Sequence, residues 1–458
     1  MKKFLEALSK KGRLAVVKEK LSPELEISSV LHSLQDQAIL FENAEGSDFR
    51  IAGNLYGDRS NLEFGLGISD GSGSFAHSVL KGIRDPSGSR GRVSGFSKSA
   101  WDKNEPADLY TLPILKHFEK EAGKYITAGV VAAKFPGSED EENLSVHRML
   151  VLTKNKVTAR IVPRHLGQIG KNSPKKTIPV TVIIGPPPSV FLASSLQVEY
   201  GLSEYRLANR FSENKLELMS SERSDVAFPV DSEIVLEGEL NFDELASEGP
   251  FVDLTGTYDE VRKQPVITFH TMHYRTDSVY HAILASSREH SLFMGLPQEL
   301  KIMEALSKSI PQVRGINLTP ASNGYFHCVV SIEKSNDGDG KTAIMNCFAA
   351  SHPLKLVIAV DSDVDPFDLE DVEWALATRF QAERGMIVVN GARGSSLDPS
   401  SAKLAVTSKL GIDATLPVKE DRSKFTRATI STSARARSAI ESISSNYTSP
   451  AVRDENRK

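Results

Sequence analysis

The sequence predicts a multi-domain protein in which a β-rich core lies between two α/β regions. Its 458 residues suffice for two to three domains at roughly 150 residues each. Short β-rich runs separated by turn residues occupy the middle of the chain, which is typical of a barrel or a sandwich. Strand-like and helical patterns alternate on both sides of that middle part, as they do in α/β folds. These observations give the fold class, α/β plus a β-barrel or sandwich.

Composition and charge exclude several other classes of protein. Hydrophobic residues make up 40% and charged residues 25%, as in ordinary globular chains. A net charge of −4 argues against a nucleic-acid partner bound through bulk charge. Cys328 and Cys347 alone cannot form a disulfide framework or a four-thiolate zinc site. Because the start has no signal-peptide core and no apolar run approaches the roughly 18–20 residues of a membrane helix, we expect a cytoplasmic protein without a transmembrane segment.

Residues 1–105 are predicted to form an N-terminal α/β region. A helix is expected from Ser22, with Pro23 and an acidic residue in its first turn. Residues 38–41 and 49–52 have strand-like composition. Two loops rich in Gly and Ser follow, at 69–74 and 86–94.

Residues 106–290 are predicted to form the β-rich domain, and residues 291–430 a C-terminal α/β domain. The β-rich runs are 124–133, 147–154, 157–162, 178–185, 232–238 and 265–273. In the C-terminal domain, a helical pattern precedes a strand at 356–360 and a helix from Asp365. Residues 431–458, rich in Ser and Arg, are predicted to be a surface helix or a frayed tail.

One acidic motif looks functional but has the wrong spacing. Asp361, Asp363 and Asp365 resemble the opening of a calcium loop, yet Pro366 and Val372 stand where that loop needs Gly and Glu. We instead expect Asp365 to cap a helix that has Pro366 at its first position.

Two glycine-containing segments also fail as nucleotide-binding motifs. Residues 340–342 lack the earlier Gly of a phosphate loop, so we expect residues 335–340 to form a hairpin turn. Residues 71–74 lack the spacing and the preceding strand of a dinucleotide fingerprint.

Four segments of the β-rich region have polar residues where a strand pattern predicts apolar ones: 143–148, 163–167, 192–204 and 247–253. Asn143, His165 and Glu204 offer an amide oxygen, an imidazole and a carboxylate. This set suits manganese or magnesium better than a thiol-preferring metal. Taken singly, His165 is more often a structural histidine and Glu204 a solvated side chain, so the set remains a candidate.

The same segments contain an arginine and two acids that could be held near it. Arg148 offers a planar fork that matches a carboxylate, and Glu248 and Asp253 flank a Gly-Pro turn. Such a pairing would keep one acid ionised and let the other exchange a proton. A structural ion-pair network is the alternative explanation, and spacing alone does not identify a reaction.

Together these segments closely resemble the UbiD family, decarboxylases that use prenylated FMN. The resemblance covers nearly the whole chain and rests on several motifs in the family's order, among them 54–57, 112–114, 125–129, 232–238, 248–251 and 410–415. It implies a split β-barrel that holds the flavin between an N-terminal α/β region and a C-terminal α/β domain used in assembly. It also implies a homo-oligomer, a dimer or a hexamer, and a flavin prenyltransferase that supplies the cofactor.

The resemblance implies roles for individual residues. The manganese ligands would be Asn143, His165 and Glu204, together with the flavin phosphate. The flavin would contact Val146, His147, Arg148, Ile161, Val162, Arg164 and His165. Ser194 and Ser195 belong to a segment near a potassium ion and the same phosphate. In catalysis, Arg148 would hold the substrate carboxylate, Glu248 would hold Arg148, and Asp253 would donate the proton.

Within the family the chain is most similar to the archaeal anhydromevalonate phosphate decarboxylases, through residues 255–265, 330–334 and 392–399. This implies conversion of trans-anhydromevalonate 5-phosphate, an unsaturated carboxylic acid, to isopentenyl phosphate and CO₂. Arg164, His147 and His352 are the local candidates for the substrate phosphate. Residues 349–352 stand where some relatives place a lysine that binds the flavin phosphate, and His352 or Lys355 could replace it.

Three alternatives remain. An aromatic decarboxylase of the same family, acting on a polyprenyl-hydroxybenzoate or another aromatic or acrylic acid, would need a long apolar pocket. A flavin-binding redox barrel would have no need of the acid pair beside Arg148. A non-catalytic assembly partner would have lost the metal or acid positions, and this chain retains them.

Overall fold

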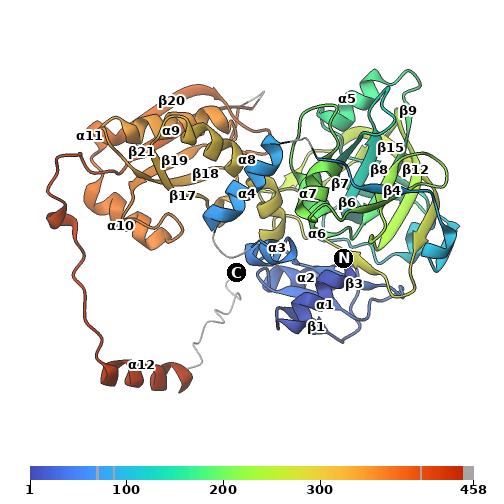
Figure 1. The fold of residues 1–458 in the computed structure, drawn as a ribbon, viewed down its shortest axis with the longest axis horizontal. Coiled ribbons are helices and arrows are strands. Elements are labelled where there is room, and N and C mark those ends of the chain that lie inside the picture. The colour runs from blue at the N-terminus through green and yellow to red at the C-terminus, as the bar shows by residue number, and fades with distance from the viewer. Residues whose placement is uncertain (69–71, 86–87, 403–404, 447–458) are drawn as a thin grey trace. The chain divides into compact units, whose positions relative to one another are not determined.

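The computed structural model describes residues 1–68, 72–85, 88–402 and 405–446. Residues 69–71 and 86–87 of the expected loops, and residues 447–458 of the expected tail, lie outside the described residues. Contacts within the chain divide it into one unit that spans Met1–Thr415 and a second that spans Leu416–Lys458. The first unit contains an N-terminal, a central and a C-terminal sheet (Figure 1).

The N-terminal sheet has the order β1-β2-β3-β16. Its strands are β1 (Leu14–Val17), β2 (Ala38–Phe41), β3 (Arg50–Gly53) and β16 (Val279–His281), and its helices are α1 (Lys2–Lys10), α2 (Glu26–Ser33), α3 (Arg59–Gly65) and α4 (Ser72–Arg84). Helix α2 begins later than the expected Ser22, because the backbone of Glu24 and Leu25 pairs with Lys116 and Leu25 has a φ of +71°. Strand β16 comes from far along the chain and pairs with β3 in parallel.

The central sheet closes into a barrel. Strands β12, β9, β6, β7, β8 and β15 follow one another as antiparallel neighbours, and β15 pairs with β12 again. Their bounds are β6 (Tyr125–Lys134), β7 (Glu142–Thr153), β8 (Lys156–Ala159), β9 (Thr177–Ile184), β12 (Ile234–Glu248) and β15 (Arg262–Tyr274), with β5 (Lys103–Pro106) added beside β15. Alternate apolar side chains of these strands pack together, Met149, Val182 and Ile267 among them. The predicted fold class is confirmed.

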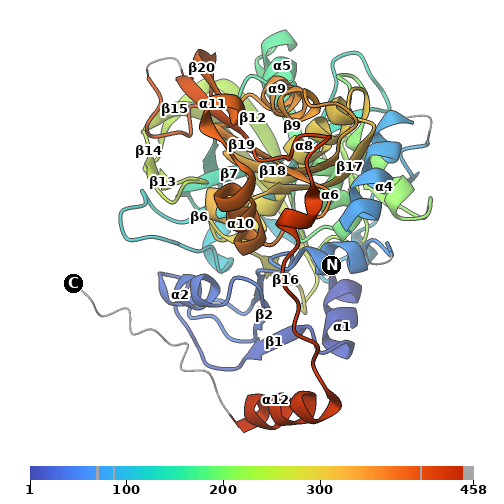
Figure 2. The ribbon, with the colours of Figure 1, turned by 90° about the vertical axis from the view of Figure 1, so that its left-hand side faces the viewer.

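Short elements surround the barrel. A side sheet contains β4 (Arg92–Ser94), β10 (Glu217–Ser220) and β11 (Ala227–Pro229), and a two-stranded ribbon contains β13 (Phe251–Val252) and β14 (Tyr258–Asp259). The helices are α5 (His165–Asn172), α6 (Pro188–Ser195) and α7 (Glu204–Phe211). Helices α6 and α7 pack against the apolar outer face of β7. Figure 2, a second view, shows α1 and α2 beside β1 and β2 in the N-terminal region.

The C-terminal sheet has the order β17-β18-β19-β21-β20, parallel in its centre and antiparallel at both edges. Its strands are β17 (Gln312–Leu318), β18 (His327–Glu333), β19 (Leu356–Asp361), β20 (Met386–Arg393) and β21 (Val406–Asp413); its helices are α8 (Arg288–Ser307), α9 (Asp339–Ala350), α10 (Leu369–Arg379) and α11 (Ala382–Gly385). The expected α/β character of this region is confirmed.

Two local predictions in this region are wrong. Residues 335–340 are not a hairpin turn, because they lead from β18 into α9 and the next strand, β19, runs parallel to β18. Asp365 does not cap the following helix: α10 begins at Leu369, and its cap is Asp368, which accepts from the Glu370 and Asp371 N–H groups. The rejection of a calcium loop agrees with the structure, since Asp361 and Asp363 both pair with Arg379.

The second unit contains helix α12 (Ala434–Asn446), whose Ile440 and Ile443 are exposed. None of the helices in the described part of the chain is long and apolar enough to cross a membrane.

Candidate functional site

Asn143, His165 and Glu204 come together from three elements; we call them the Glu204 cluster. Glu204 is the first residue of α7, whose cap is the Ser203 hydroxyl, and it is 1% exposed. Asn143 of β7 donates from Nδ2 to Glu204 Oε1 at 3.1 Å, and the Leu144 N–H donates to Oε2 at 2.7 Å. His165, the first residue of α5, holds Nδ1 3.8 Å from Glu204 Oε1.

The chemistry of the Glu204 cluster fits a cation. Burial raises the pKa of Glu204, and no lysine or arginine in the described chain forms an ion pair with it. A divalent ion would offset this buried carboxylate. A half-turn of the Asn143 amide would present Oδ1 to such an ion. The described residues contain no group of three His, Cys, Asp or Glu that could hold a metal, so the amide would have to complete the set.

Arg148 lies among three carboxylates, which together with it form the Arg148 cluster. Its Nε and Nη2 donate to the two oxygens of Glu248 at 2.9 and 3.0 Å, the paired geometry that a guanidinium favours. Its Nη1 donates to Asp253 Oδ2 at 2.5 Å, and its Nη2 to Asp259 Oδ2 at 2.9 Å. The Phe251 ring lies 4.6 Å from the guanidinium carbon. The sequence-based grouping of Arg148, Glu248 and Asp253 is therefore seen as direct contact.

Asp259 is a member that sequence reasoning missed. It ends β14 and also accepts from Arg262 Nη1 at 2.6 Å, so it bridges two arginines, which hold the pKa of its carboxyl below the ordinary value against the effect of burial. Gly249 allows the backbone at Glu260, next to Asp259, to lie close to the Gly-Pro turn. Its φ is +98°, and a Cβ there would lie 3.1 Å from the Glu260 carbonyl oxygen. The i, i+3 spacing of Asp259 and Arg262 was the available signal, but such pairs are common on protein surfaces.

A cavity of about 340 Å³ opens beside the Arg148 cluster. Asp253 and Asp259 line it from the β13–β14 ribbon, Arg262 from the start of β15, and Ser396 and Leu397 from the C-terminal domain. Asp253 is therefore the member of the predicted catalytic trio that lines this cavity. Of the five N–H groups of Arg148, the four described above are already donated, which leaves one on Nη1.

His147 is buried and both of its ring nitrogens are engaged. Nε2 faces the Ser145 hydroxyl at 2.8 Å, and Nδ1 faces the Arg160 carbonyl oxygen at 2.9 Å. Burial lowers the pKa of His147 to about 4, so the ring is neutral at physiological pH. By the alternation of β7, His147 shares a face with Asn143, and Arg148 shares the opposite face with Val146.

The other predicted cofactor-binding residues lie around the ends of these elements. Ile161 and Val162 are half-buried, and exposed Arg164 immediately precedes α5. Ser194 and Ser195 end α6, and their hydroxyls donate to carbonyl oxygens three residues earlier, at 2.8 and 2.7 Å. The carboxyl end of a helix carries partial negative charge, which is compatible with a monovalent cation.

His290, near the start of α8, is a second residue that sequence reasoning missed. Its Nδ1 accepts from the Ser286 N–H at 3.0 Å. Its pKa is lowered by burial, and the charges of Asp253 and Arg148 also act on it in opposite directions. The Ser286 hydroxyl in turn donates to the Leu254 carbonyl oxygen at 3.0 Å, so Ser286 links His290 to the residue that follows Asp253.

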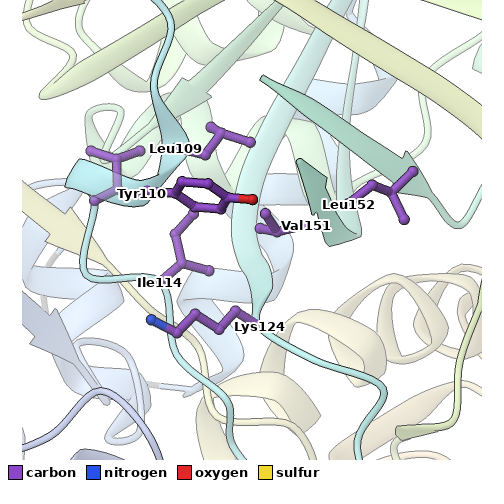
Figure 3. Close-up of a pocket in the computed structure, with 7 residues that line it drawn as sticks. Leu109, Tyr110, Ile114, Lys124, Val151 and Leu152 are labelled. Carbon is purple, nitrogen blue, oxygen red and sulfur yellow. The ribbon is translucent and has the colours of Figure 1, made fainter. Parts of the chain in front are cut away.

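A second cavity, of about 330 Å³, contains none of the predicted site residues. It is lined by Leu109, Tyr110, Ile114, Lys124, Val151 and neighbouring residues, and Figure 3 shows the Tyr110 ring among these apolar side chains. This cavity offers a single charged group and lies outside the site.

Comparison with known proteins identifies the family. Three descriptions match in succession: the N-terminal domain of 3-octaprenyl-4-hydroxybenzoate carboxy-lyase at residues 5–73, its Rift-related domain at 92–288, and its C-terminal domain at 291–414. The chain belongs to the UbiD family of carboxy-lyases, as its motifs indicated.

Relatives and solved structures agree with this assignment. The chain is 37% identical to an anhydromevalonate phosphate decarboxylase of Methanothermobacter thermautotrophicus, over 91% of this chain and 97% of the relative. It is 38% identical to the protein of the same name in Methanosarcina mazei, over 93% and 98%. The UbiD-class enzyme HmfF from Pelotomaculum thermopropionicum, solved in complex with FMN, matches with a TM-score of 0.91 and 31% identity over 96% of this chain and 99% of that one.

Proposed function

We propose that this protein is a decarboxylase that converts trans-anhydromevalonate 5-phosphate to isopentenyl phosphate and CO₂. The observation that supports this most is the Arg148 cluster, in which Asp253 faces a cavity beside a carboxylate-binding guanidinium. The similarity to several archaeal proteins named anhydromevalonate phosphate decarboxylase, at 34–41% identity, favours this substrate over an aromatic acid.

The cofactor would be prenylated FMN, since HmfF has been solved with FMN and with prenylated FMN. When bound, it would supply an electron sink for the carbon that loses CO₂. Val146, His147, Ile161, Val162 and Arg164 are the residues proposed to contact it. The Glu204 cluster would hold manganese, and the end of α6 at Ser194 and Ser195 would face potassium.

The chain's own groups would then act on the substrate. Arg148 orients the carboxylate through its remaining Nη1 hydrogen, while Glu248 fixes the guanidinium in its plane. The bond from the carboxyl carbon to C2 breaks, its electron pair stays on C2, and Asp253 delivers a proton to C2. With Asp253 protonated, Arg148 and Arg262 are balanced by Glu248 and Asp259, so the cluster is neutral at that step.

Assembly and cofactor supply belong to the same proposal. An evolved form of HmfF is described as dimeric, and we propose a homo-oligomer for this chain as well. A flavin prenyltransferase would provide the cofactor.

The function can be tested with protein purified without oxygen from cells that also express a flavin prenyltransferase. We expect CO₂ and isopentenyl phosphate from the phosphorylated acid, with flavin and manganese bound in the same preparation. A Glu204→Gln variant should lose metal and flavin together while remaining folded. Preferential turnover of a polyprenyl-hydroxybenzoate would refute the substrate assignment, and flavin retention without metal would refute the metal site.

A further inference from the structure

Five basic side chains come from α8, the α9–β19 connection, β20, β21 and the residue before α5. They are Arg164, Lys301, His352, Arg393 and Lys409, and we call them the basic cluster. The family resemblance makes Arg164 and His352 candidate phosphate contacts but gives no role to Lys301, Arg393 or Lys409.

Hydrogen bonds bring the C-terminal members together. The Ser351 hydroxyl donates to Gln298 of α8 at 3.0 Å, and Lys301 lies one turn further along the same face of that helix. His352 follows Ser351 directly. The Lys409 ammonium donates to the His352 carbonyl oxygen at 2.8 Å and to a second carbonyl oxygen at 2.9 Å.

The charges of the other four members all act on His352. The pKa of His352 is lowered first by burial and then by the positive charges of Arg393, Lys409, Lys301 and Arg164. Burial lowers the pKa of Lys301, and the charge of Arg164 lowers it further. Arg393 ends β20, the strand that pairs with β21, which contains Lys409. Hydrogen bonds and strand pairing thus place Lys301, Lys409 and Arg393 on the elements around His352, and the charge of Arg164 acts on the same histidine.

This region has no internal counter-charge. Within residues 1–68, 72–85, 88–402 and 405–446, no ion pair joins any of the five side chains to a carboxylate, although Lys355 nearby pairs with Asp398 at 2.9 Å. Lys409 is only 4% exposed, and burial lowers its pKa to about 8. Cations held together without a carboxylate disfavour one another, and an anion placed among them would relieve that cost.

The basic cluster also lies near the reacting groups. Burial raises the pKa of Tyr325, while the charges of Arg164 and Asp253 act on the same phenol in opposite directions. Ser396 and Leu397, which follow Arg393 on the chain, line the same cavity as Asp253, so the C-terminal end of the basic cluster adjoins that cavity. Arg164 is also proposed to contact the flavin, and the resemblance places His352 near the flavin phosphate. Lys301, Arg393 and Lys409 have no such role and are therefore available for another anion.

We propose that the basic cluster binds the phosphomonoester of the substrate, with Lys301, Arg393 and Lys409 as its specificity-determining residues. This inference rests on the proposed function, because it requires a substrate that has both a carboxylate and a phosphate. His147 is not part of the subsite, since its ring is neutral and both nitrogens are engaged.

The test compares Lys301→Gln and Arg393→Gln holoenzymes with wild type on the phosphorylated acid and on its dephosphorylated form. Lys308→Gln serves as the matched control, because Lys308 follows the same helix and pairs with Glu304. Each cluster variant should raise KM for the phosphorylated acid roughly ten- to hundredfold, the effect of one charge-assisted hydrogen bond. The kcat, the turnover of the dephosphorylated acid and the flavin absorbance per chain should stay at wild-type values, as should every parameter of the control.

Calorimetric titration of each holoenzyme with inorganic phosphate gives a readout that does not depend on turnover. Weaker phosphate binding in Lys301→Gln than in Lys308→Gln would support the subsite. Loss of flavin from the cluster variants would overturn the inference in favour of the flavin phosphate, and an unchanged KM would also overturn it. If wild type binds phosphate through the cluster but does not decarboxylate the phosphorylated acid, the proposed function fails while the anion subsite stands.

Discussion

The Arg148 cluster and the basic cluster are two charged regions arranged in opposite ways. Arg148 is surrounded by Glu248, Asp253 and Asp259, so its charge is more than balanced within the protein. The basic cluster has no carboxylate partner in the described part of the chain. Together with Arg262, which pairs with Asp259, the first arrangement differs from neutrality by one proton and suits proton transfer, whereas the second suits an anion from outside. We therefore assign proton transfer to the Arg148 cluster and recognition of the substrate phosphate to the basic cluster.

The largest effect that would test this contrast is expected from Asp253→Asn. Asparagine keeps the shape and can still accept a hydrogen bond from Arg148, but it cannot deliver a proton. The kcat should fall about 10²–10⁴-fold, which is the usual contribution of general acid catalysis. Flavin and metal content should stay unchanged. The measurement is turnover together with deuterium incorporation into the product from heavy water.

If Asp253 were only a structural partner of Arg148, the variant would lose stability and flavin together. Near-normal turnover and deuterium incorporation in a variant with full flavin content would instead transfer the proton-donating role to Glu248.

Lys409 allows the lack of a counter-charge in the basic cluster to be tested by pH. Its pKa is lowered by burial from about 10.5 to about 8, so between these pH values the unfolded chain binds more protons than the folded one. The free energy of unfolding should therefore rise with pH across that window, relative to a Lys409→Met variant. The gain is at most about 1.4 kcal/mol per pH unit, and solvent screening reduces it. Denaturant unfolding at pH 7.5, 8.5 and 9.5 measures this difference.

The control for Lys409 is Lys308→Met, which replaces an exposed lysine. Its stability difference from wild type should not change with pH in the same window. Parallel curves for wild type and Lys409→Met would contradict the burial of an uncompensated ammonium.

The smallest effect is expected from Asp259→Asn. Arg148 would keep Glu248 and Asp253 but lose one charge-assisted hydrogen bond, so kcat/KM should fall about tenfold. Because Asp259 acts through Arg148, flavin content should be unaffected and Asp259→Glu should restore part of the activity. A loss of activity as large as that of Asp253→Asn would show that Asp259 itself takes part in the chemistry.

Much of the fold could be predicted because it is encoded locally. The six β-rich runs correspond to the barrel strands β6, β7, β8, β9, β12 and β15, since alternation along each strand reflects its own two faces. The turn at 335–340 was misjudged because a turn signal does not say whether the next strand pairs antiparallel or parallel. Asp365 and Asp368 are both suitable caps, and Asp365 is instead used in a turn that receives the Phe367 N–H.

Less of the candidate site could be predicted from the sequence. Glu248 and Asp253 lie 100 and 105 residues from Arg148, so the prediction of their contact came from family resemblance. Asp259 gave only an ordinary surface-pair signal. The basic cluster draws on residues from Arg164 to Lys409 that form no motif, and only the packing of α8 against the Ser351 loop brings part of it together.

Strand β16 has a consequence for how the chain is made. The N-terminal sheet receives its fourth strand roughly 230 residues after β3, and a ribosome needs about 10–45 s for that length at about 5–20 residues per second. Until then β3 has an open edge, which is a hazard for pairing with another chain. The N-terminal region therefore cannot reach its final form before the whole barrel has been synthesised. A shortened gene that ends before residue 279 would yield a protein with that edge permanently exposed.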